Sequence, residues 1–117
     1  MPWSDPASDI RRCVEGPSSA LLVGVAERGV VATAIVGHDG HRGWIYYVAV
    51  HPELQGHGLG REIVAAAEAW LTDRDVPRLL LMVREGNQKV VPFYERLGYE
   101  EAPRIPMAKW LKAPSTG

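Results

Sequence analysis

The stretch that decides the fold is residues 47–61, Tyr47-Val48-Ala49-Val50-His51-Pro52-Glu53-Leu54-Gln55-Gly56-His57-Gly58-Leu59-Gly60-Arg61. It contains the end of an apolar strand, a short turn and a cluster of glycines. Beyond it, apolar residues recur every three or four positions, at Leu59, Ile63, Ala66 or Ala67 and Trp70. This spacing predicts an amphipathic helix that ends near Asp73. The stretch therefore predicts a strand that passes into a helix through a glycine-rich loop.

The glycine loop, Gln55–Gly60, has the features of an anion site. Glycine admits backbone conformations that strain other residues, and its missing side chain lets a ligand approach the amides. The first N–H groups of a helix lack internal partners and lie at the positive end of its dipole. Together they suit the oxygens of a di- or polyphosphate. The alternative is that the glycines only turn the chain.

Two other phosphate-binding motifs are excluded by the residues around this loop. A P-loop needs Gly-Lys followed by Ser or Thr, whereas Gly60 is followed by Arg61 and Glu62. A dinucleotide-binding fingerprint needs a different glycine spacing, inside a parallel sheet that begins the chain.

The rest of the chain predicts a mixed α/β (α+β) architecture. The expected elements are a short helix that Ser8 or Asp9 caps and Gly16-Pro17 ends, strands at Ala20–Ala26, Val30–Val36 and Gly43–Val50, the helix after the glycine loop, a strand at Leu79–Val83, a helix at Asn87–Leu97 and a last strand at Ile105–Leu111. The first three strands form an antiparallel meander. The continuous apolar run after Arg78 is typical of a strand buried on both sides. Pro103 and Pro106 limit the last strand to an edge. The ends, Met1–Pro6 and Ala113–Gly117, are expected to be irregular.

The composition is that of one globular domain over residues 1–117. Apolar residues make up 46% and charged residues 23%, with a net charge of −1. This balance gives no reason to expect a nucleic acid or an anionic membrane as a partner, and no apolar run approaches the length of a membrane span. The single cysteine, Cys13, cannot form an internal disulfide. Because that fits a reducing compartment, we expect a cytoplasmic protein.

Two motifs resemble the GNAT superfamily of N-acetyltransferases. The first is Gln55-x-x-Gly58-x-Gly60 after an apolar strand, and the second is Asn87-x-x-Val90-x-Pro92-Phe93-Tyr94-Glu95-Arg96-Leu97-Gly98-Tyr99. The resemblance extends from about Ala20 to Tyr99. It implies a GNAT-like, mostly antiparallel sheet with a strand-helix-strand crossover. It also implies acetyl-CoA as co-substrate, no metal, and transfer of the acetyl group to a primary amine by direct attack in a ternary complex.

The resemblance also implies a set of cofactor contacts. Backbone amides hold the diphosphate, at Gln55, Gly56, His57, Gly58, Leu59, Gly60 and Arg61. Val50 pairs with the pantetheine arm as a strand would, and the N–H near Val48 faces the thioester carbonyl. This requires residues 44–50 to splay from residues 79–83. Asn87 contacts the pantetheine or a bridging water; its alternative role is a helix N-cap.

For the chemistry, the resemblance assigns Tyr94 as the general acid that protonates the departing thiolate. The alternative is that Tyr94 packs in the core, although Val90, Phe93 and Leu97 make the better apolar stripe. The general base is left unassigned, with Glu53, His41 and His51 as the remaining candidates. Tyr46 and Tyr47 are expected to alternate across the strand, so that one of them orders a water chain.

The chain departs from the family at its beginning. The family normally opens with a strand and a helix before the segment that corresponds to Asp9–Glu15, and residue 1 comes too late for both. The strand Ala20–Ala26 is then an exposed edge, which favours a homodimer.

Two other functions stay open from the residues alone. The missing opening elements and the unassigned base favour a non-catalytic acyl-CoA-binding or sensor module that dimerisation completes. A structural dimerisation domain that binds no nucleotide is the weaker alternative. For an enzyme, the acceptor is a small-molecule or peptide amine, among which the fold does not choose.

Overall fold

The computed structural model describes residues 6–112. The chain forms two compact units. The sheet unit is residues 9–81, and the described part of the carboxyl-terminal unit is residues 6–8 and 82–112. The irregular ends expected from the sequence lie outside the described residues, apart from Pro6, which begins a helix.

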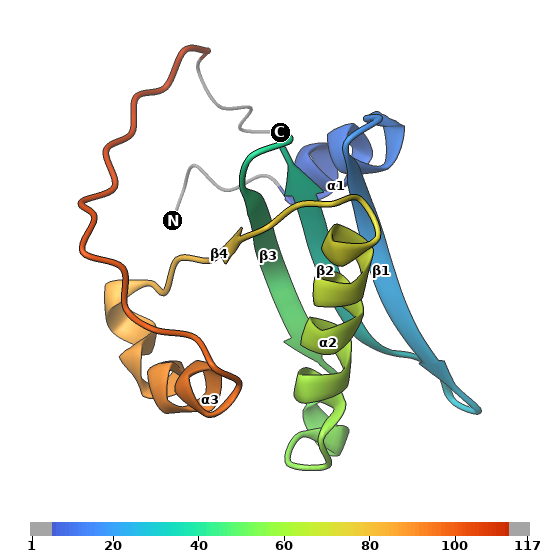
Figure 1. The fold of residues 1–117 in the computed structure, drawn as a ribbon. Helices are drawn as coiled ribbons and strands as arrows, with labels where there is room; N and C mark the ends of the chain where they lie inside the picture. Colours follow the sequence, from blue (N-terminus) through green and yellow to red (C-terminus); the bar gives the residue numbers. More distant parts are fainter. Residues whose placement is uncertain (1–5, 113–117) are drawn as a thin grey trace. The chain divides into compact units, whose positions relative to one another are not determined.

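The sheet unit is built on four strands, β1 (Ser19–Ala26), β2 (Gly29–His38), β3 (Gly43–Val50) and β4 (Leu79–Leu80). The order is β1-β2-β3-β4, with antiparallel pairing from β1 to β3 and parallel pairing of β4 with β3 (Figure 1). The predicted meander is thus confirmed. β1 ends the order, as expected of an edge strand, and the homodimer expected from that edge stays a prediction.

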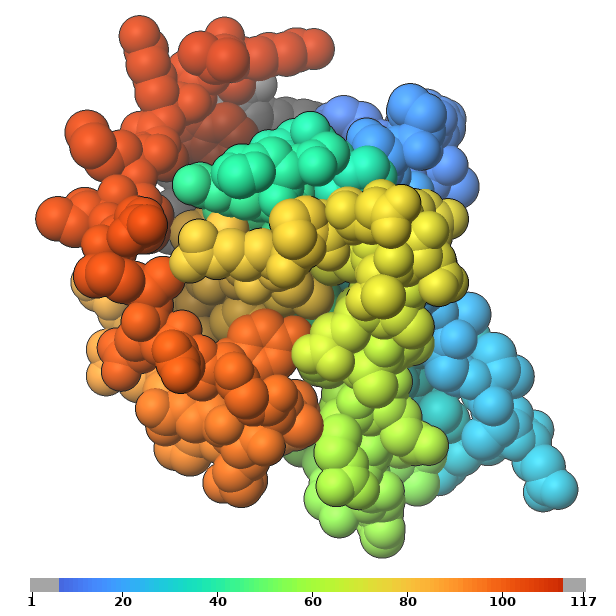
Figure 2. Space-filling model, viewed as in Figure 1, coloured from blue at the N-terminus to red at the C-terminus, as the bar shows by residue number. Residues whose placement is uncertain are grey.

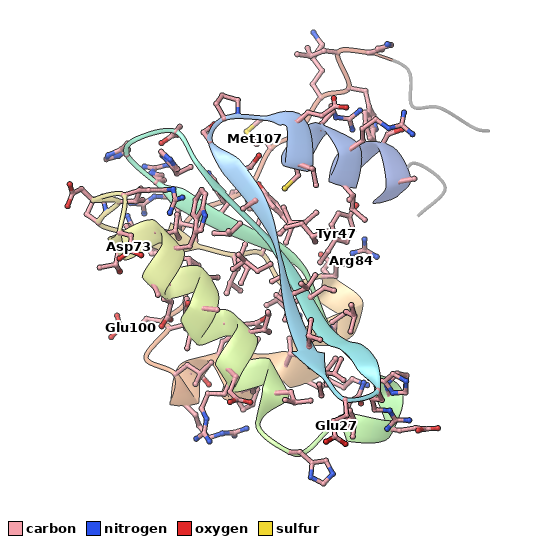
Figure 3. The ribbon with its side chains drawn as sticks, turned by 90° about the vertical axis from the view of Figure 1, so that its right-hand side faces the viewer. Glu27, Tyr47, Asp73, Arg84, Glu100 and Met107 are labelled. Carbon is pink, nitrogen blue, oxygen red and sulfur yellow. The ribbon has the colours of Figure 1, made fainter. Side chains whose placement is uncertain are left out.

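Two helices lie on opposite faces of this sheet (Figure 3). α1 (Pro6–Glu15) ends directly before Gly16, and α2 (Leu59–Thr72) matches the helix predicted after the glycine loop. The core lies between α2 and the strands. Its α2 side chains are Ile63, Val64, Ala67 and Leu71, and the strands supply Ala34, Val36 and Ile45 among others. Figure 2 shows α2 covering this face of the sheet unit.

Gly43 marks the closest approach of α2 to the sheet. A Cβ added to this glycine would lie 2.5 Å and 2.7 Å from the two methyl carbons of Leu71, which is only 2% exposed. The added Cβ would therefore force the Leu71 side chain, which lines a pocket with Thr72 and Val76, out of its packed position. We therefore expect Gly43→Ala to lower the free energy of unfolding by about 1–3 kcal/mol, the usual cost of an overpacked core. Urea denaturation measures this change.

Gly24→Ala is the matched control for this prediction. Its added Cβ would meet the Cβ of Ala32 at 3.4 Å, an ordinary van der Waals distance. An unfolding free energy for Gly43→Ala equal to that of Gly24→Ala would show that α2 does not pack against β3 as described.

The strand predicted at Leu79–Val83 is wrong beyond Leu80. β3 pairs with β4 only at Gly43–Leu79 and Trp44–Leu80, and a strand needs a hydrogen-bonding neighbour to continue. The prediction that this apolar segment is buried on both sides is also wrong, since Met82 is 59% exposed.

The carboxyl-terminal unit contains a 3₁₀ helix, η2 (Glu85–Val90), followed by α3 (Val91–Arg96). The single helix predicted at Asn87–Leu97 is therefore wrong, because Asn87 has the non-helical angles φ −124° and ψ 27°, and Pro92 fits only in the first turn of α3. The strand predicted at Ile105–Leu111 is also wrong. That segment has no strand pairing, and the side chains of Ile105 and Leu111 are exposed.

Candidate functional site

The turn after β3 is fixed by local contacts within the sheet unit. The His51 N–H donates to the Val31 carbonyl at 2.8 Å, which continues the pairing with β2. A short 3₁₀ helix, η1 (Pro52–Leu54), follows, and His51 Nδ1 accepts from the Glu53 N–H at 3.2 Å. The Arg28 guanidinium at the β1–β2 turn pairs with the Glu53 carboxylate at 2.7 Å. These contacts set where the glycine loop begins.

The glycine loop then enters α2 in a left-handed conformation. Gly56 and Gly58 have φ of 85° and 83°, and Gly58 is the N-cap of α2. No side chain caps this helix. The Glu62 N–H donates to the Gly58 carbonyl at 3.1 Å, so the three preceding amides of the helix, at Leu59, Gly60 and Arg61, have no helical acceptor. Main-chain donors and the positive end of a 14-residue helix are therefore gathered at one place.

Side chains around these amides leave room for a ligand. Gln55, Gly56 and His57 are exposed, and a Cβ placed on Gly56 would meet nothing within 4 Å. The Arg61 guanidinium lies near Gly58, with Nη2 3.6 Å from the position of an added Cβ. The loop thus combines exposed main-chain donors with a nearby cation, which are the features of an anion site.

The outer edge of β3 is the second part of the candidate site. Within the sheet unit, β4 pairs only with Gly43 and Trp44, so the edge of β3 that carries Val48 and Val50 extends beyond β4. The splay of residues 44–50 from residues 79–83 stays a prediction, because residues 82 and 83 belong to the other compact unit. The Gln55 amide lies 3.5 Å from the Val50 carbonyl, a long hydrogen bond that joins the loop to the strand.

A bulge in β3, which the sequence did not predict, interrupts its pairing with β2. Ile35 pairs with Tyr46 and Thr33 with Ala49, so two residues of β3, Tyr47 and Val48, oppose the single residue Ala34. Tyr47 has a φ of +51°. The expected regular alternation of Tyr46 and Tyr47 is therefore wrong. The Tyr46 ring stacks on Trp44 with centroids 6.5 Å apart, and burial raises the pKa of its phenol.

Asn87 and Tyr94 lie in the carboxyl-terminal unit. Asn87 is exposed inside η2 and caps neither helix, since the N-caps are Arg84 and Val90; its alternative role as an N-cap is wrong. Tyr94 is half-buried on α3. Its ring makes edge contacts with Phe93 and Tyr99, with centroids 5.0 Å and 5.7 Å apart. Burial raises the pKa of Tyr94 above the usual 10, so its phenol holds a proton at neutral pH.

The remaining candidates for the general base either make structural contacts or are exposed to solvent. Glu53 pairs with Arg28, His51 caps η1 and His41 is exposed. Within residues 6–112, no three His, Cys, Asp or Glu side chains are grouped as metal ligands would be. No helix in the same range is long and apolar enough to cross a membrane.

Comparison with known proteins identifies a family that this chain matches. The model of the acetyltransferase (GNAT) family matches residues 1–99. Among solved structures, AAC(6')-Iy in complex with the bisubstrate analogue CoA-S-monomethyl-acetylneamine is 16% identical, with 92% of this chain and 80% of that chain covered and a TM-score of 0.78. A Trypanosoma brucei acetyltransferase is 24% identical, with 90% and 75% covered and a TM-score of 0.70. The BH1408 protein of Bacillus halodurans, as a tetramutant, is 24% identical, with 92% and 75% covered and a TM-score of 0.73.

Proposed function

Because the chain belongs to the GNAT acetyltransferase family, we propose that it transfers the acetyl group of acetyl-CoA to the nitrogen of a primary amine. The observation that carries the proposal is the junction of β3 with α2. There, left-handed Gly56 and Gly58 expose the first amides of a long helix next to a strand edge that extends past its neighbour. An extended ligand with a diphosphate at one end fits both parts.

In this proposal the residues divide into two groups. The amides of residues 55–61 bind the diphosphate, and the backbone of Val50 pairs with the pantetheine arm. Asn87 binds the same arm directly or through a water. Because these donors belong mostly to the main chain, binding of the co-substrate depends little on the identity of the side chains.

The chemical step needs an oxyanion donor and an acid. The thioester of acetyl-CoA supplies a C–S bond, which breaks as the amine nitrogen bonds to the carbonyl carbon and loses a proton to water. The Val48 N–H stabilises the charge on the carbonyl oxygen, and the Tyr94 hydroxyl gives its proton to the leaving sulfur. A covalent enzyme intermediate on cysteine is disfavoured, because the single cysteine, Cys13, is buried on α1. Attack is then direct, within a ternary complex.

We also propose that residues 1–117 act as one acetyltransferase domain. The family model spans both compact units, since it extends through residue 99. A small-molecule amine is the first class of acceptor to test, because AAC(6')-Iy is an aminoglycoside N-acetyltransferase. The cytoplasmic location rests on the single cysteine and stays a prediction.

Co-substrate binding is expected to stabilise the protein. Acetyl-CoA at about 100 times its dissociation constant should raise the free energy of unfolding by about 2.7 kcal/mol, measured as a shift of thermal unfolding. Acetyl-pantetheine is the matched control, because it carries the same thioester and arm without the diphosphate. Equal shifts at equal concentration would contradict the anion site at α2.

Transfer itself is tested by the release of free thiol from acetyl-CoA with a panel of aminoglycosides, polyamines, lysine peptides and peptide N-termini. Amine-dependent release supports the enzyme. Binding of acetyl-CoA without release for any amine would instead favour the non-catalytic acyl-CoA-binding module.

A further inference from the structure

Tyr47 has the most unusual backbone conformation in the sheet unit. Its φ of +51° is left-handed, and an aromatic side chain makes that conformation unfavourable. The other non-glycine residue with positive φ within residues 6–112 is Asp75. It lies in the turn that ends α2, where its N–H donates to the Thr72 carbonyl at 3.0 Å, and aspartate tolerates this region well. Tyr47 needs another explanation, because strained residues persist only where the surrounding structure holds them.

α1 supplies a contact that holds the Tyr47 side chain. The Tyr47 hydroxyl donates to the Asp9 carboxylate, with Oη 2.7 Å from Oδ2. The other oxygen of Asp9 pairs with the Arg12 guanidinium one turn along the same helix. Figure 3 shows Tyr47 on the face of the sheet that bears α1. The acceptor of Tyr47 is thus oriented by a second side chain.

α1 is itself anchored at its other end. The Ser19 hydroxyl at the start of β1 donates to the Cys13 carbonyl at 2.8 Å, and the Cys13 side chain is buried. A helix fixed at its carboxyl end in this way presents Asp9 to β3 at a defined place. The link therefore runs from β1 through α1 to the bulge.

We propose that Asp9 and Tyr47 are positioning residues, whose hydrogen bond holds the β3 bulge so that the Val48 amide meets the thioester carbonyl. The inference rests on the proposed function, in which that amide is the oxyanion donor. Such a donor acts only when it is in place before the reaction. Relaxation of the bulge should therefore reduce turnover, whereas acetyl-CoA binding depends on the amides of residues 55–61 and should persist.

The test compares two replacements of the same tyrosine. Tyr47→Phe keeps the ring and the strain but removes the hydrogen bond. We expect kcat to fall about tenfold, less than the loss of a whole oxyanion donor, with the KM for acetyl-CoA within about twofold of wild type. Tyr47→Gly also lacks the bond, but glycine adopts a positive φ without strain. The glycine variant should therefore recover kcat to within about threefold of wild type.

Asp9→Ala removes the acceptor of the same hydrogen bond. It should lower kcat as Tyr47→Phe does, and the double variant should be no slower than either single one, because both changes remove one interaction. This variant also decides the question if Tyr47→Phe does not fold.

The outcomes separate the two proposals. The positioning role is overturned if Tyr47→Phe has the kcat of the wild type. If Tyr47→Phe does not fold, the same result for Asp9→Ala overturns it. It is also overturned if Tyr47→Gly is slower than Tyr47→Phe, because the aromatic ring would then act directly in the reaction. Absence of transfer by the wild-type protein with every amine would overturn the proposed function, and the positioning role with it.

Discussion

Tyr94→Phe is expected to lower kcat by about 10²- to 10³-fold, within the range that general acids contribute, while the dissociation constant for CoA stays within about twofold of wild type. The reason is that only the hydroxyl is removed. The aromatic ring that contacts Phe93 and Tyr99 remains, so the packing of α3 is kept. Stopped assays of thiol release give kcat, and calorimetry gives CoA binding.

Tyr99→Phe is the matched control for this change. It removes a hydroxyl from the ring that packs against Tyr94 at 5.7 Å, and it should leave kcat within about twofold of wild type. Equal losses in the two variants would show that the hydroxyls matter for packing and not for proton transfer.

The pH profile gives a second test of the same acid. Burial raises the pKa of Tyr94 above 10, so the phenol loses its proton only at still higher pH. The kcat of the wild type should therefore decrease above pH 10, as Tyr94 loses its proton. The residual kcat of Tyr94→Phe should not show this decrease. A loss of kcat near pH 7 to 8 that disappears in that variant would contradict the raised pKa.

Gly58→Ala is expected to weaken CoA binding by about tenfold or more. Gly58 has a φ of 83° as the N-cap of α2, and a left-handed conformation costs an L-residue about 1–2 kcal/mol. The variant relieves that strain by turning the peptide groups at the start of α2, so the amides no longer converge on the diphosphate. Calorimetry with CoA measures the loss.

Gly40→Ala is the control for strain alone. Gly40 has a φ of 85°, and its added Cβ would meet nothing within 4 Å, but it lies in the turn between β2 and β3. Both alanine variants should lose similar unfolding free energy, and only Gly58→Ala should lose affinity. Parallel losses of affinity in the two would mean that binding follows global stability and not the amides of α2.

The part of the fold that sequence reasoning reached is the part that local patterns determine. Alternation and turn residues gave the three antiparallel strands, and the spacing from Leu59 to Trp70 gave α2. The conformation of the glycine loop followed from residue type, because left-handed positions favour glycine. Gln55 to Arg61 could thus be placed at a helix start without a structure.

The missed features depend on contacts between distant residues. No local signal marks the bulge at Tyr47, which is held by Asp9 38 positions earlier. The short β4 could not be read from Leu79–Val83, because the end of pairing with β3 decides its length. The break between η2 and α3 lies next to Pro92. The apolar residues Ile105 and Leu111 led to the prediction of a strand, but apolar character alone does not supply a pairing partner.

The loop at the start of α2 also bears on how such a protein can evolve. Its donors are N–H groups, which every residue except proline possesses, so substitutions at Gln55, His57 or Leu59 leave the number of donors unchanged. Selection then acts strongly on Gly56 and Gly58, whose backbone angles exclude most side chains, and weakly on their neighbours. A lineage can therefore replace most of its residues while the loop keeps its shape.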